Sequence, residues 1–471
     1  MTQPSALSPP TRTGLESRIM AERPRAAAAG AAAARRIAVL GTGYVGLTTG
    51  ACLCSLGHRV ICADVDSGKV SRLTRGELDI REPGLAELLR AGLTSGRLSF
   101  VTGIAAAVAE AEMVFLCLPT PTGPDGVPDL SAVEAAVDAC RRLLSAGGII
   151  VTKSTVPVGT ARRIARSLGR DDVGVVSNPE FLREGCTVAD FMHPDRIVVG
   201  CDRPSLAKEV AALYAPLGAP AVLIDAASAE LAKYAANCFL AVKLSYLNAI
   251  AELCERLDAD ISEVAEVLGY DGRIGQDYLS PGPGWGGSCL PKDTTALVQM
   301  ADAAGLRFGL LRAAIQGNMR QERRMTEKVR SAVTGEPGGS VSGKRIGLLG
   351  LTFKAGTNDL RESPALAVAA RLHRAGAELA GCDPAVPPDQ DLGAIRVVAD
   401  AYAAAADADA IVVLTEWTQF CTLDWMKVAK VMRTPVVVDT RNLLDAEVLR
   451  RSGLVYTGLG RGLRARSRME I

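Results

Sequence analysis

The sequence has few histidines, no excess of charge of either sign and no long uninterrupted apolar run. It contains 53 Lys and Arg against 52 Asp and Glu, which gives a formal net charge of +1. No long run of one sign builds a face that would attract a polyanion, so we expect no nucleic-acid partner. The three histidines, His58, His193 and His373, lie away from other ligand types at metal-binding spacing. We therefore expect no metal site.

Hydrophobic residues make up 48% of the 471-residue chain, yet no apolar stretch reaches the roughly 18 residues that a membrane-spanning helix needs. Residues 1–34 are rich in Pro, Ala, Ser and Arg, and this composition predicts a disordered extension. Pro, Arg and Glu interrupt any apolar core of a signal peptide there. The twelve cysteines include no CxxC pair, which is typical of reduced thiols. We therefore expect a soluble, cytoplasmic protein without a membrane span.

Short apolar runs alternate with helix-length segments along residues 35–225. The runs lie at residues 36–41, 59–64, 113–118, 149–152, 173–176 and 197–199. This alternation predicts a parallel doubly wound sheet. The chain is also too long for a single core, which favours at least two domains.

The pattern changes beyond residue 226. Residues 228–257 have helical periodicity without Gly or Pro, which predicts a long central helix. The segment SPGPGWGGSCLPKD at 280–293 is too dense in Gly and Pro for a regular element. EPGGSVSGK at 336–344 is typical of a linker.

A second α/β section begins at Arg345, with buried strands predicted at 409–415 and 435–440. We therefore predict an α/β fold of two Rossmann-like doubly wound domains joined by a long central helix and a helical region. The predicted ranges are 35–225 for the first domain, 226–335 for the helical region and 336–471 for the second domain.

A glycine-rich turn, GTGYVG, follows the first predicted strand and precedes a helix. Gly41, Gly43 and Gly46 permit a tight turn and let a pyrophosphate approach the backbone at the helix N-terminus. Asp64 ends the second strand 23 residues after Gly41, where it can accept from ribose hydroxyls and would repel a 2′-phosphate. The turn therefore indicates NAD rather than NADP; the alternative is a turn of structural value alone.

Cys289 lies among small residues in the sequence GGSCLPKD, beside Lys292 and Asp293. An accessible sulfur near an ammonium is typical of a nucleophile; the alternative is a loop cysteine without a chemical role. Lys233 and Asn237 are four residues apart on the central helix and share one face. They could stabilise an oxyanion, or form a solvated polar face.

Further polar residues follow predicted strands. Thr120, Thr155, Glu180 and Glu184 come after three different strands. The carboxyl ends of parallel strands gather at one edge of a sheet, where ligands bind. We therefore expect these residues in one crevice.

Seven motifs occur in order between about residues 36 and 444: GTGYVGLTTG, LPTPTG, KSTVPVGT, NPEFLREG, AELAKYAANCFLAVKLSYLNAIAELCE, GGSCLPKD and GLTFKAGTNDLRES. Together they resemble the UDP-glucose/GDP-mannose dehydrogenase family. The resemblance implies an NAD-dependent, four-electron oxidation of the C6 hydroxyl of a nucleotide sugar to a carboxylate. In this chemistry Cys289 captures the aldehyde as a thiohemiacetal, which becomes a thioester and is hydrolysed.

The resemblance also assigns roles residue by residue. Implied catalytic residues are Cys289, Lys233, Asn237, Asp293, Thr155 and Glu180. Implied cofactor-binding residues are Gly41, Gly43, Tyr44, Val45, Gly46, Asp64, Lys69, Thr120, Thr155, Glu184, Lys292 and Arg361. Implied substrate-binding residues are Glu180, Phe181, Leu182, Arg183, Glu184, Lys233, Asn237, Arg273, Tyr278, Leu279, Ser280, Pro281, Gly282, Gly286, Lys354 and Arg441. Arg273 is implied to act from a neighbouring subunit, in a homodimer or higher homo-oligomer built on the long helix.

The segment GYDGRIGQDYLSPGPGWGGSC is most similar to family members that oxidise UDP-glucose. Three alternatives stay open. They are the same chemistry on GDP-mannose or a UDP-N-acetylhexosamine, a two-electron β-hydroxyacid dehydrogenase, and a nucleotide-sugar-binding protein without turnover.

Overall fold

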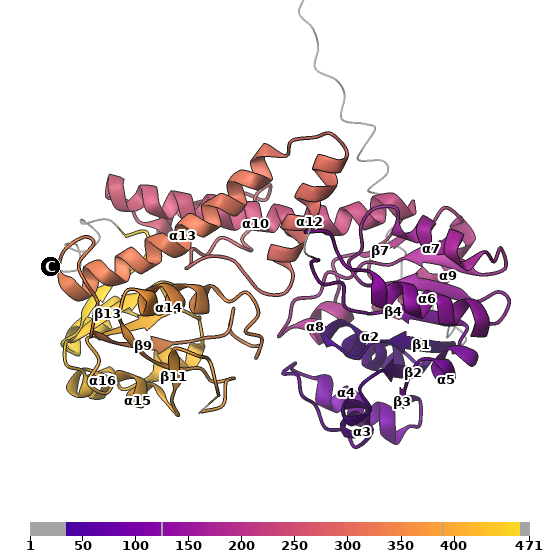
Figure 1. Cartoon of the computed structure of the whole chain (residues 1–471), viewed down its shortest axis with the longest axis horizontal. Helices are drawn as coiled ribbons and strands as arrows, with labels where there is room; N and C mark the ends of the chain where they lie inside the picture. Colours follow the sequence, from indigo (N-terminus) through magenta and orange to yellow (C-terminus); the bar gives the residue numbers. More distant parts are fainter. Residues whose placement is uncertain (1–33, 124–125, 389, 462–471) are drawn as a thin grey trace, which may run out of the picture.

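The computed structural model describes residues 34–123, 126–388 and 390–461. The predicted extension at 1–34 lies outside the described residues except for Ala34. Two α/β lobes lie side by side, and the long helix α10 (Ala226–Leu257) runs across both of them (Figure 1). Helix α13 (Gly309–Thr334) packs against α10 and the second lobe.

The first lobe holds an eight-stranded sheet in the order β3-β2-β1-β4-β5-β6-β7-β8. The strands are β1 (Arg36–Leu40), β2 (Arg59–Asp64), β3 (Leu98–Thr102), β4 (Met113–Leu116), β5 (Ile149–Thr152), β6 (Gly174–Ser177), β7 (Ile197–Gly200) and β8 (Ala221–Ile224). The first six strands are parallel and have the doubly wound order. The predicted parallel doubly wound sheet is confirmed, with one antiparallel pair, where β7 meets β6 through Ser177 and Gly200.

Helices cover both faces of this sheet. They are α2 (Tyr44–Ser55), α3 (Ser67–Thr74), α4 (Leu85–Thr94), α5 (Ala105–Ala109), α6 (Ser131–Leu143), α7 (Thr160–Leu168), α8 (Thr187–Met192) and α9 (Pro204–Ala212), with a 3₁₀ turn at Ala215–Leu217. Alternate residues of β1 enter different cores: Ile37 and Val39 pack on one side, and Ala38 and Leu40 on the other. Two covered faces explain why β1 reads as a continuous apolar run.

The middle of the chain is helical, with α10 (Ala226–Leu257), α11 (Ile261–Tyr270), α12 (Leu290–Ala303) and α13 (Gly309–Thr334). The predicted long helix at 228–257 is therefore confirmed. Glu230 on α10 accepts hydrogen bonds from the backbone nitrogens of Gly159, at 2.6 Å, and Ala161, at 2.7 Å. This fixes the first half of α10 to the N-terminus of α7. Leu247 and Ala251, near its other end, pack in the core of the second lobe.

The second lobe repeats the plan of the first. Its strands are β9 (Arg345–Leu349), β10 (Glu378–Cys382), β11 (Ile395–Val397), β12 (Ala410–Val413), β13 (Val436–Asp439) and β14 (Val455–Thr457), and its helices are α14 (Pro364–Arg374), α15 (Ala401–Ala405), α16 (Trp425–Val431) and α17 (Ala446–Arg451), with a 3₁₀ turn at Thr418–Thr422. All strand pairs are parallel, in the order β11-β10-β9-β12-β13-β14. The two-lobed α/β fold is thus confirmed, whereas the domain boundaries stay a prediction.

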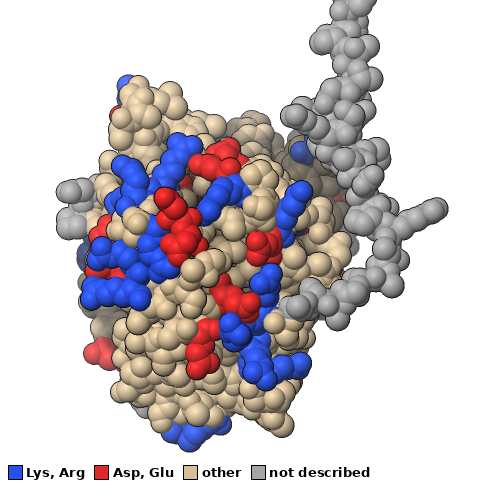
Figure 2. All heavy atoms as spheres, turned by 90° about the vertical axis from the view of Figure 1, so that its right-hand side faces the viewer, with Lys and Arg blue, Asp and Glu red and all other residues tan. Residues whose placement is uncertain are grey.

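The surface offers no large face of one charge in the view of the first lobe. Lys and Arg are interspersed with Asp and Glu over this side of the molecule (Figure 2). Within the described ranges, every helix is too short or too polar to cross a membrane.

Candidate active site

A cavity of about 920 Å³ lies between the two lobes. Its walls come from the segments that follow β5 and β6, from α10, from the loop before α12 and from the second lobe. Ligands of open α/β sheets bind at this carboxyl edge. The predicted site residues that line the cavity are Glu180, Phe181, Leu182, Arg183, Glu184, Lys233, Asn237, Tyr278, Ser280, Pro281, Gly282, Gly286, Cys289, Lys354 and Arg441.

Cys289 stands at the N-cap of α12 and contributes to the cavity wall. Burial raises the pKa of its thiol, and the ammonium of Lys233 partly offsets this effect. The hydroxyl of Ser288 lies 3.5 Å from the Cys289 sulfur. The free N–H groups of the first helical turn also favour negative charge there. The thiol is therefore protonated at rest, in surroundings that stabilise the thiolate once it forms.

The ammonium that acts most strongly on this sulfur is not the one that the sequence suggested. Lys292 is next to Asp293, and its Nζ lies 2.7 Å from an Asp293 carboxylate oxygen. Lys233, which is distant in sequence, lowers the pKa of Cys289 instead. Proximity in sequence does not identify the ammonium that acts on Cys289, because the side chain of Lys292 on α12 points to Asp293.

Lys233 forms a buried ion pair with Glu180, with 2.9 Å between Nζ and Oε1. Burial works to lower the pKa of Lys233, but the nearby acidic groups of Glu180, Cys289 and Asp293 and the hydrogen bond to Glu180 together outweigh it, so the pKa is raised. The second carboxylate oxygen of Glu180 accepts from the backbone nitrogen of Leu182 at 2.6 Å. Glu180 therefore holds a protonated Lys233 in the cavity wall, where it can stabilise an oxyanion.

Asn237 is held by Asp293, because its Nδ2 donates to Asp293 Oδ2 at 2.6 Å. Asp293 is 1% exposed and lies behind the wall. Lys233 and Asn237 are 3% and 9% exposed, which excludes a solvated polar face. They lie one turn apart on α10, and both line the cavity.

Glu184 connects the wall to the second lobe. Its Oε1 accepts from the hydroxyl of Ser288 at 2.7 Å and lies 3.5 Å from the guanidinium of Arg361. Arg361 also pairs with Asp359 at 2.6 Å. Burial raises the pKa of Glu184 to about 7. This carboxyl group therefore changes charge near neutral pH.

The glycine-rich turn has the geometry that a dinucleotide needs. Gly41 has φ +94°, and a Cβ on Gly46 would lie 1.9 Å from the Gly41 carbonyl oxygen. A Cβ on Gly43 would meet nothing within 4 Å, so the space in front of that backbone is open. The turn therefore leaves room for a pyrophosphate at the start of α2.

Asp64 lies at the end of β2, beside this turn. It accepts from the backbone nitrogen of Thr42 at 3.0 Å and from the Thr42 hydroxyl. Burial works to raise the pKa of Asp64, but these hydrogen bonds and the nearby charge of Lys69 outweigh it and lower the pKa. The carboxylate is therefore ionised at neutral pH, which suits ribose hydroxyls and disfavours a 2′-phosphate.

Tyr44 joins the turn to the second lobe, because its hydroxyl donates to Asn358 Oδ1 at 2.6 Å and lies 3.2 Å from the Thr357 hydroxyl. Thr120 donates to the carbonyl oxygen of Thr155 at 2.9 Å, so the ends of β4 and β5 meet here. Tyr44, Thr120 and Thr155 thus lie at the carboxyl edge of the first sheet.

Two predicted substrate residues lie elsewhere. Arg273 is exposed and pairs with Asp271 at 2.6 Å, and it is not in the cavity wall of its own chain. Leu279 is buried and packs in the core of the second lobe. Its apolar side chain satisfies that core, whereas its neighbours Tyr278 and Ser280 line the cavity.

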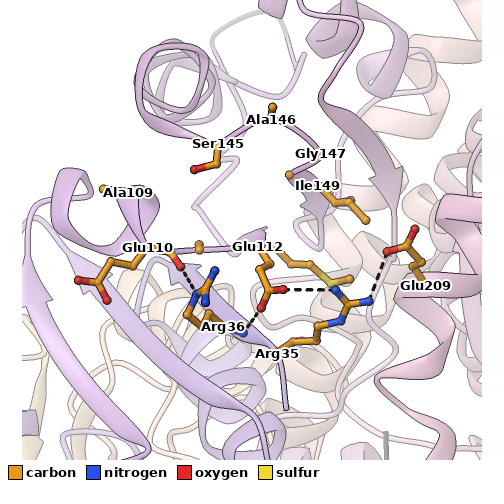
Figure 3. Close-up of a pocket in the computed structure, with 13 residues that line it drawn as sticks. Arg35, Arg36, Ala109, Glu110, Glu112, Ser145, Ala146, Gly147, Ile149 and Glu209 are labelled. Carbon is orange, nitrogen blue, oxygen red and sulfur yellow. Dashed lines mark hydrogen bonds and ion pairs between the residues drawn. The ribbon is translucent and has the colours of Figure 1, made fainter. Parts of the chain in front are cut away.

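A second hollow of about 600 Å³ lies at the opposite edge of the first sheet. Its two arginines are already engaged: Arg35 pairs with Glu112 and Glu209, and Arg36 donates to the Glu110 carbonyl oxygen (Figure 3). The cavity between the lobes, which gathers the predicted site residues, is therefore the candidate active site.

The chain matches three domains of one protein family. The NAD binding domain of the UDP-glucose/GDP-mannose dehydrogenase family matches residues 35–218, the central domain residues 227–320 and the UDP binding domain residues 347–446. The UDP-glucose 6-dehydrogenase TuaD of Bacillus subtilis (strain 168) is 41% identical over 435 residues, which cover 91% of this chain and 93% of that protein. The UDP-glucose 6-dehydrogenase of Rhizobium meliloti (strain 1021) is 43% identical over 438 residues, which cover 90% and 99%.

The chain belongs to the UDP-glucose/GDP-mannose dehydrogenase family. The structure agrees, because a UDP-glucose dehydrogenase from the hyperthermophilic archaeon Pyrobaculum islandicum is similar with a TM-score of 0.82 and 37% identity. That match covers 91% of this chain and 98% of the other. The protein is an NAD-dependent dehydrogenase of this family, and the predicted cofactor is confirmed.

Several residues of this family member were not singled out from the sequence. Lys153, Asn178, Lys243 and Glu416 line the cavity, and Ser288 bridges Cys289 and Glu184. Lys153 and Asn178 do carry a signal, because each directly follows a buried strand. The others lie in helices or loops where a single polar residue is ordinarily solvated.

We expect Asp64→Asn to raise the KM for NAD about tenfold or more, because charge-assisted hydrogen bonds to ribose are lost. The preference for NAD over NADP should fall in parallel. Steady-state kinetics with both cofactors measures this. Asp66→Asn, an exposed neighbour, is the matched control. An unchanged NAD/NADP ratio in Asp64→Asn would contradict the assignment.

We expect Lys233→Met to slow alkylation of Cys289 by iodoacetamide at neutral pH about tenfold, since loss of the ammonium raises the thiol pKa further. Peptide mass mapping over time measures the rate, with exposed Cys186 as the internal control. Lys233→Arg keeps the charge and should react as the native protein does. Equal rates of Cys289 alkylation in Lys233→Met and the native protein would contradict the effect of Lys233 on the thiol pKa.

Proposed function

We propose that this enzyme oxidises UDP-glucose at C6 to UDP-glucuronate in two successive hydride transfers, with Cys289 as a covalent nucleophile. The observation that carries the proposal is the convergence of Cys289, the Lys233–Glu180 pair and the Asn237–Asp293 pair on one cavity. The names of the similar proteins from Bacillus subtilis and Rhizobium meliloti support UDP-glucose as the substrate.

In the first oxidation the substrate hydroxyl loses its proton to solvent and C6 loses a hydride. Lys233 and Asn237 donate hydrogen bonds to the oxygen while it is negatively charged, which stabilises the transition state. Glu180 and Asp293 keep these two donors in place. NAD held at the turn of Gly41 and by Asp64 would accept this hydride, and a second NAD molecule in the same place would accept the hydride of the second oxidation.

The aldehyde is then captured by Cys289. A bond forms between its sulfur and C6, the thiol proton leaves, and the oxygen becomes the hydroxyl of a thiohemiacetal. Burial keeps the thiol protonated at rest, so the nearby ammonium of Lys233 is needed to stabilise the thiolate. The second hydride leaves this adduct, and its C–O bond becomes the carbonyl of a thioester.

Water completes the cycle. Its oxygen attacks the thioester carbon, the C–S bond breaks, and Cys289 regains a proton. We assign the polar groups of Thr155, Glu180 and Asp293 to positioning and deprotonating this water. Four electrons leave the substrate, and the covalent bond keeps the aldehyde from escaping between the two oxidations.

The second lobe supplies two cations for the diphosphate of the nucleotide sugar. Lys354 and Arg441 line the cavity, and Arg441 is held by Glu416, with 3.2 Å between Nε and Oε2. A Cβ on Gly282 would lie 2.9 Å from an Arg441 nitrogen, so glycine there lets the loop approach the guanidinium. Planar guanidinium and flexible ammonium groups are both suited to phosphate.

We also propose that two copies of the chain associate along α10. Leu231, Phe239, Tyr246, Leu253 and Leu257 are exposed on this helix, and their spacing places them on one stripe. A continuous apolar stripe on a monomer surface marks an interface. The exposed position of Arg273 fits a residue that serves the site of a partner copy.

The number of NADH molecules formed per UDP-glucose tests the function. We expect two for the native enzyme, and a fall in steady turnover of about 10³-fold or more in Cys289→Ser. Cys186→Ser, at an exposed cysteine, is the matched control. One NADH that survives the Cys289 substitution would contradict the covalent role. Activity with GDP-mannose or a UDP-N-acetylhexosamine in place of UDP-glucose would contradict the substrate.

Multi-angle light scattering over a dilution series tests the interface. We expect a dimeric mass for the native chain and a monomeric mass for Phe239→Asp, because a buried carboxylate opposes association. Met426→Asp is the control, since Met426 is 60% exposed against 66% for Phe239 and lies off the stripe. A monomeric native chain would overturn the proposal.

A further inference from the structure

Lys153 is an ammonium buried in the wall of the active-site cavity. It is 5% exposed and directly follows β5. The pairing of Thr152 with Ser177 places Lys153 beside Asn178, which follows β6. Both residues line the same cavity as Cys289.

The contacts of Lys153 are mostly neutral. Its Nζ donates to Asn178 Oδ1 at 3.3 Å and lies 6.0 Å and 5.7 Å from the ring centres of Phe191 and Tyr214. Tyr214 donates to the same Asn178 oxygen at 2.6 Å, and Asn178 Nδ2 donates to the Val198 carbonyl oxygen at 2.8 Å. This network fixes the amide oxygen toward the lysine.

Among the described residues, no carboxylate lies within ion-pair distance of Lys153. A lysine this deep is costly to bury without a contacting counter-charge. Methionine would fill the same space without that cost. A lysine at this position therefore points to a role for its charge rather than for its packing.

Four titratable groups face Lys153 from other elements. They are Glu180 in the segment after β6, Lys233 on α10, Cys117 after β4 and Tyr214 after α9. Burial lowers the pKa of Lys153 to about 8, and the charge of Glu180 opposes this shift while that of Lys233 adds to it. Burial also works to raise the pKa of Glu180, but Lys233 and, less strongly, Lys153 hold it below its usual value.

We propose that Lys153 is a positioning residue that acts through Glu180: its ammonium is the second buried positive charge that keeps this carboxylate ionised and in place against Lys233. The inference rests on the proposed function of the site. Two cations thereby act on Glu180: Lys233 in direct contact and Lys153 from beyond ion-pair distance. Lys153 and Cys289 line the same cavity, so the ammonium of Lys153 also favours the thiolate of Cys289 directly by its charge, whereas the charge of Glu180 opposes that thiolate.

The charge of Lys153 makes activity depend on pH. Lys153 is charged below about pH 8 and loses its charge above it, so activity should fall with an alkaline limb near that pH. The substitution Lys153→Arg replaces the ammonium with a guanidinium that stays charged throughout. This variant should therefore retain activity and move the limb to higher pH, whereas Lys153→Met should lack this limb.

The test compares pH profiles of kcat for the native enzyme, Lys153→Met and Lys153→Arg at saturating UDP-glucose and NAD. We expect Lys153→Met to lower kcat about 10- to 100-fold, with the KM for NAD unchanged. Its midpoint of thermal unfolding should equal or exceed the native value, which separates the effect from misfolding. Lys208→Met, which removes an exposed lysine on α9, is the matched control.

Alkylation of Cys289 as a function of pH gives a second readout that needs no turnover. Loss of the Lys153 charge should shift the midpoint of alkylation upward in Lys153→Met and leave it near the native value in Lys153→Arg. A native enzyme that does not oxidise UDP-glucose would contradict the proposed function. The alkylation measurement would still decide the role of Lys153. Native-like kcat, alkaline limb and alkylation in Lys153→Met would overturn the inference.

Discussion

A buried ammonium needs a counter-charge, and the pair between Lys233 and Glu180 meets this need at the centre of the molecule. The pair joins α10 to the segment after β6, so the central helix and the first sheet fix each other at this point. The same ammonium acts on the sulfur of Cys289, which reaches the site from another part of the chain. Removal of either partner would leave an uncompensated charge inside the cavity wall. The remaining groups of the site keep their positions only while Lys233 and Glu180 neutralise each other.

The sequence predicted those features that depend on local pattern. The turn at Gly41, the strand that ends at Asp64 and a long helix at 228–257 all follow from spacing and composition, and the structure extends that helix to Ala226. The strands β3 and β8 and the reversed direction of β7 were not predicted, because short edge strands carry a weak pattern and pairing direction depends on distant contacts. For the site, the sequence could name candidate residues. It could not name the side chains with which each candidate forms hydrogen bonds or ion pairs.

The residues around Cys289 illustrate this limit. Lys292 is near in sequence and pairs with Asp293, while Lys233 acts from the far helix. Arg273 matches a family motif, yet the sequence of one chain does not indicate whether Arg273 belongs to the site of its own subunit or to that of a neighbouring subunit. Leu279 lies between two cavity residues and faces the core, because the loop alternates its side chains between the two environments.

The two lobes share a plan but treat the equivalent acid differently. Asp64 binds Thr42 in a position that still reaches solvent. Asp383, at the same place in the second lobe, accepts from Thr352 and from the indole of Trp417, and it is buried. Burial and these hydrogen bonds make Asp383 less available to a ribose than Asp64 is. The first lobe matches an NAD binding domain and the second lobe a UDP binding domain.

The hydrogen bond between Tyr44 and Asn358 has a consequence for the order of events. The proposed cycle consumes two cofactor molecules for each sugar, so spent cofactor must be exchanged while the adduct stays on Cys289. Tyr44 lies in the cofactor turn, whereas Asn358 belongs to the second lobe. Neither residue lines the cavity that holds Cys289. In the proposed cycle, cofactor exchange and retention of the sugar adduct therefore depend on different contacts of the chain.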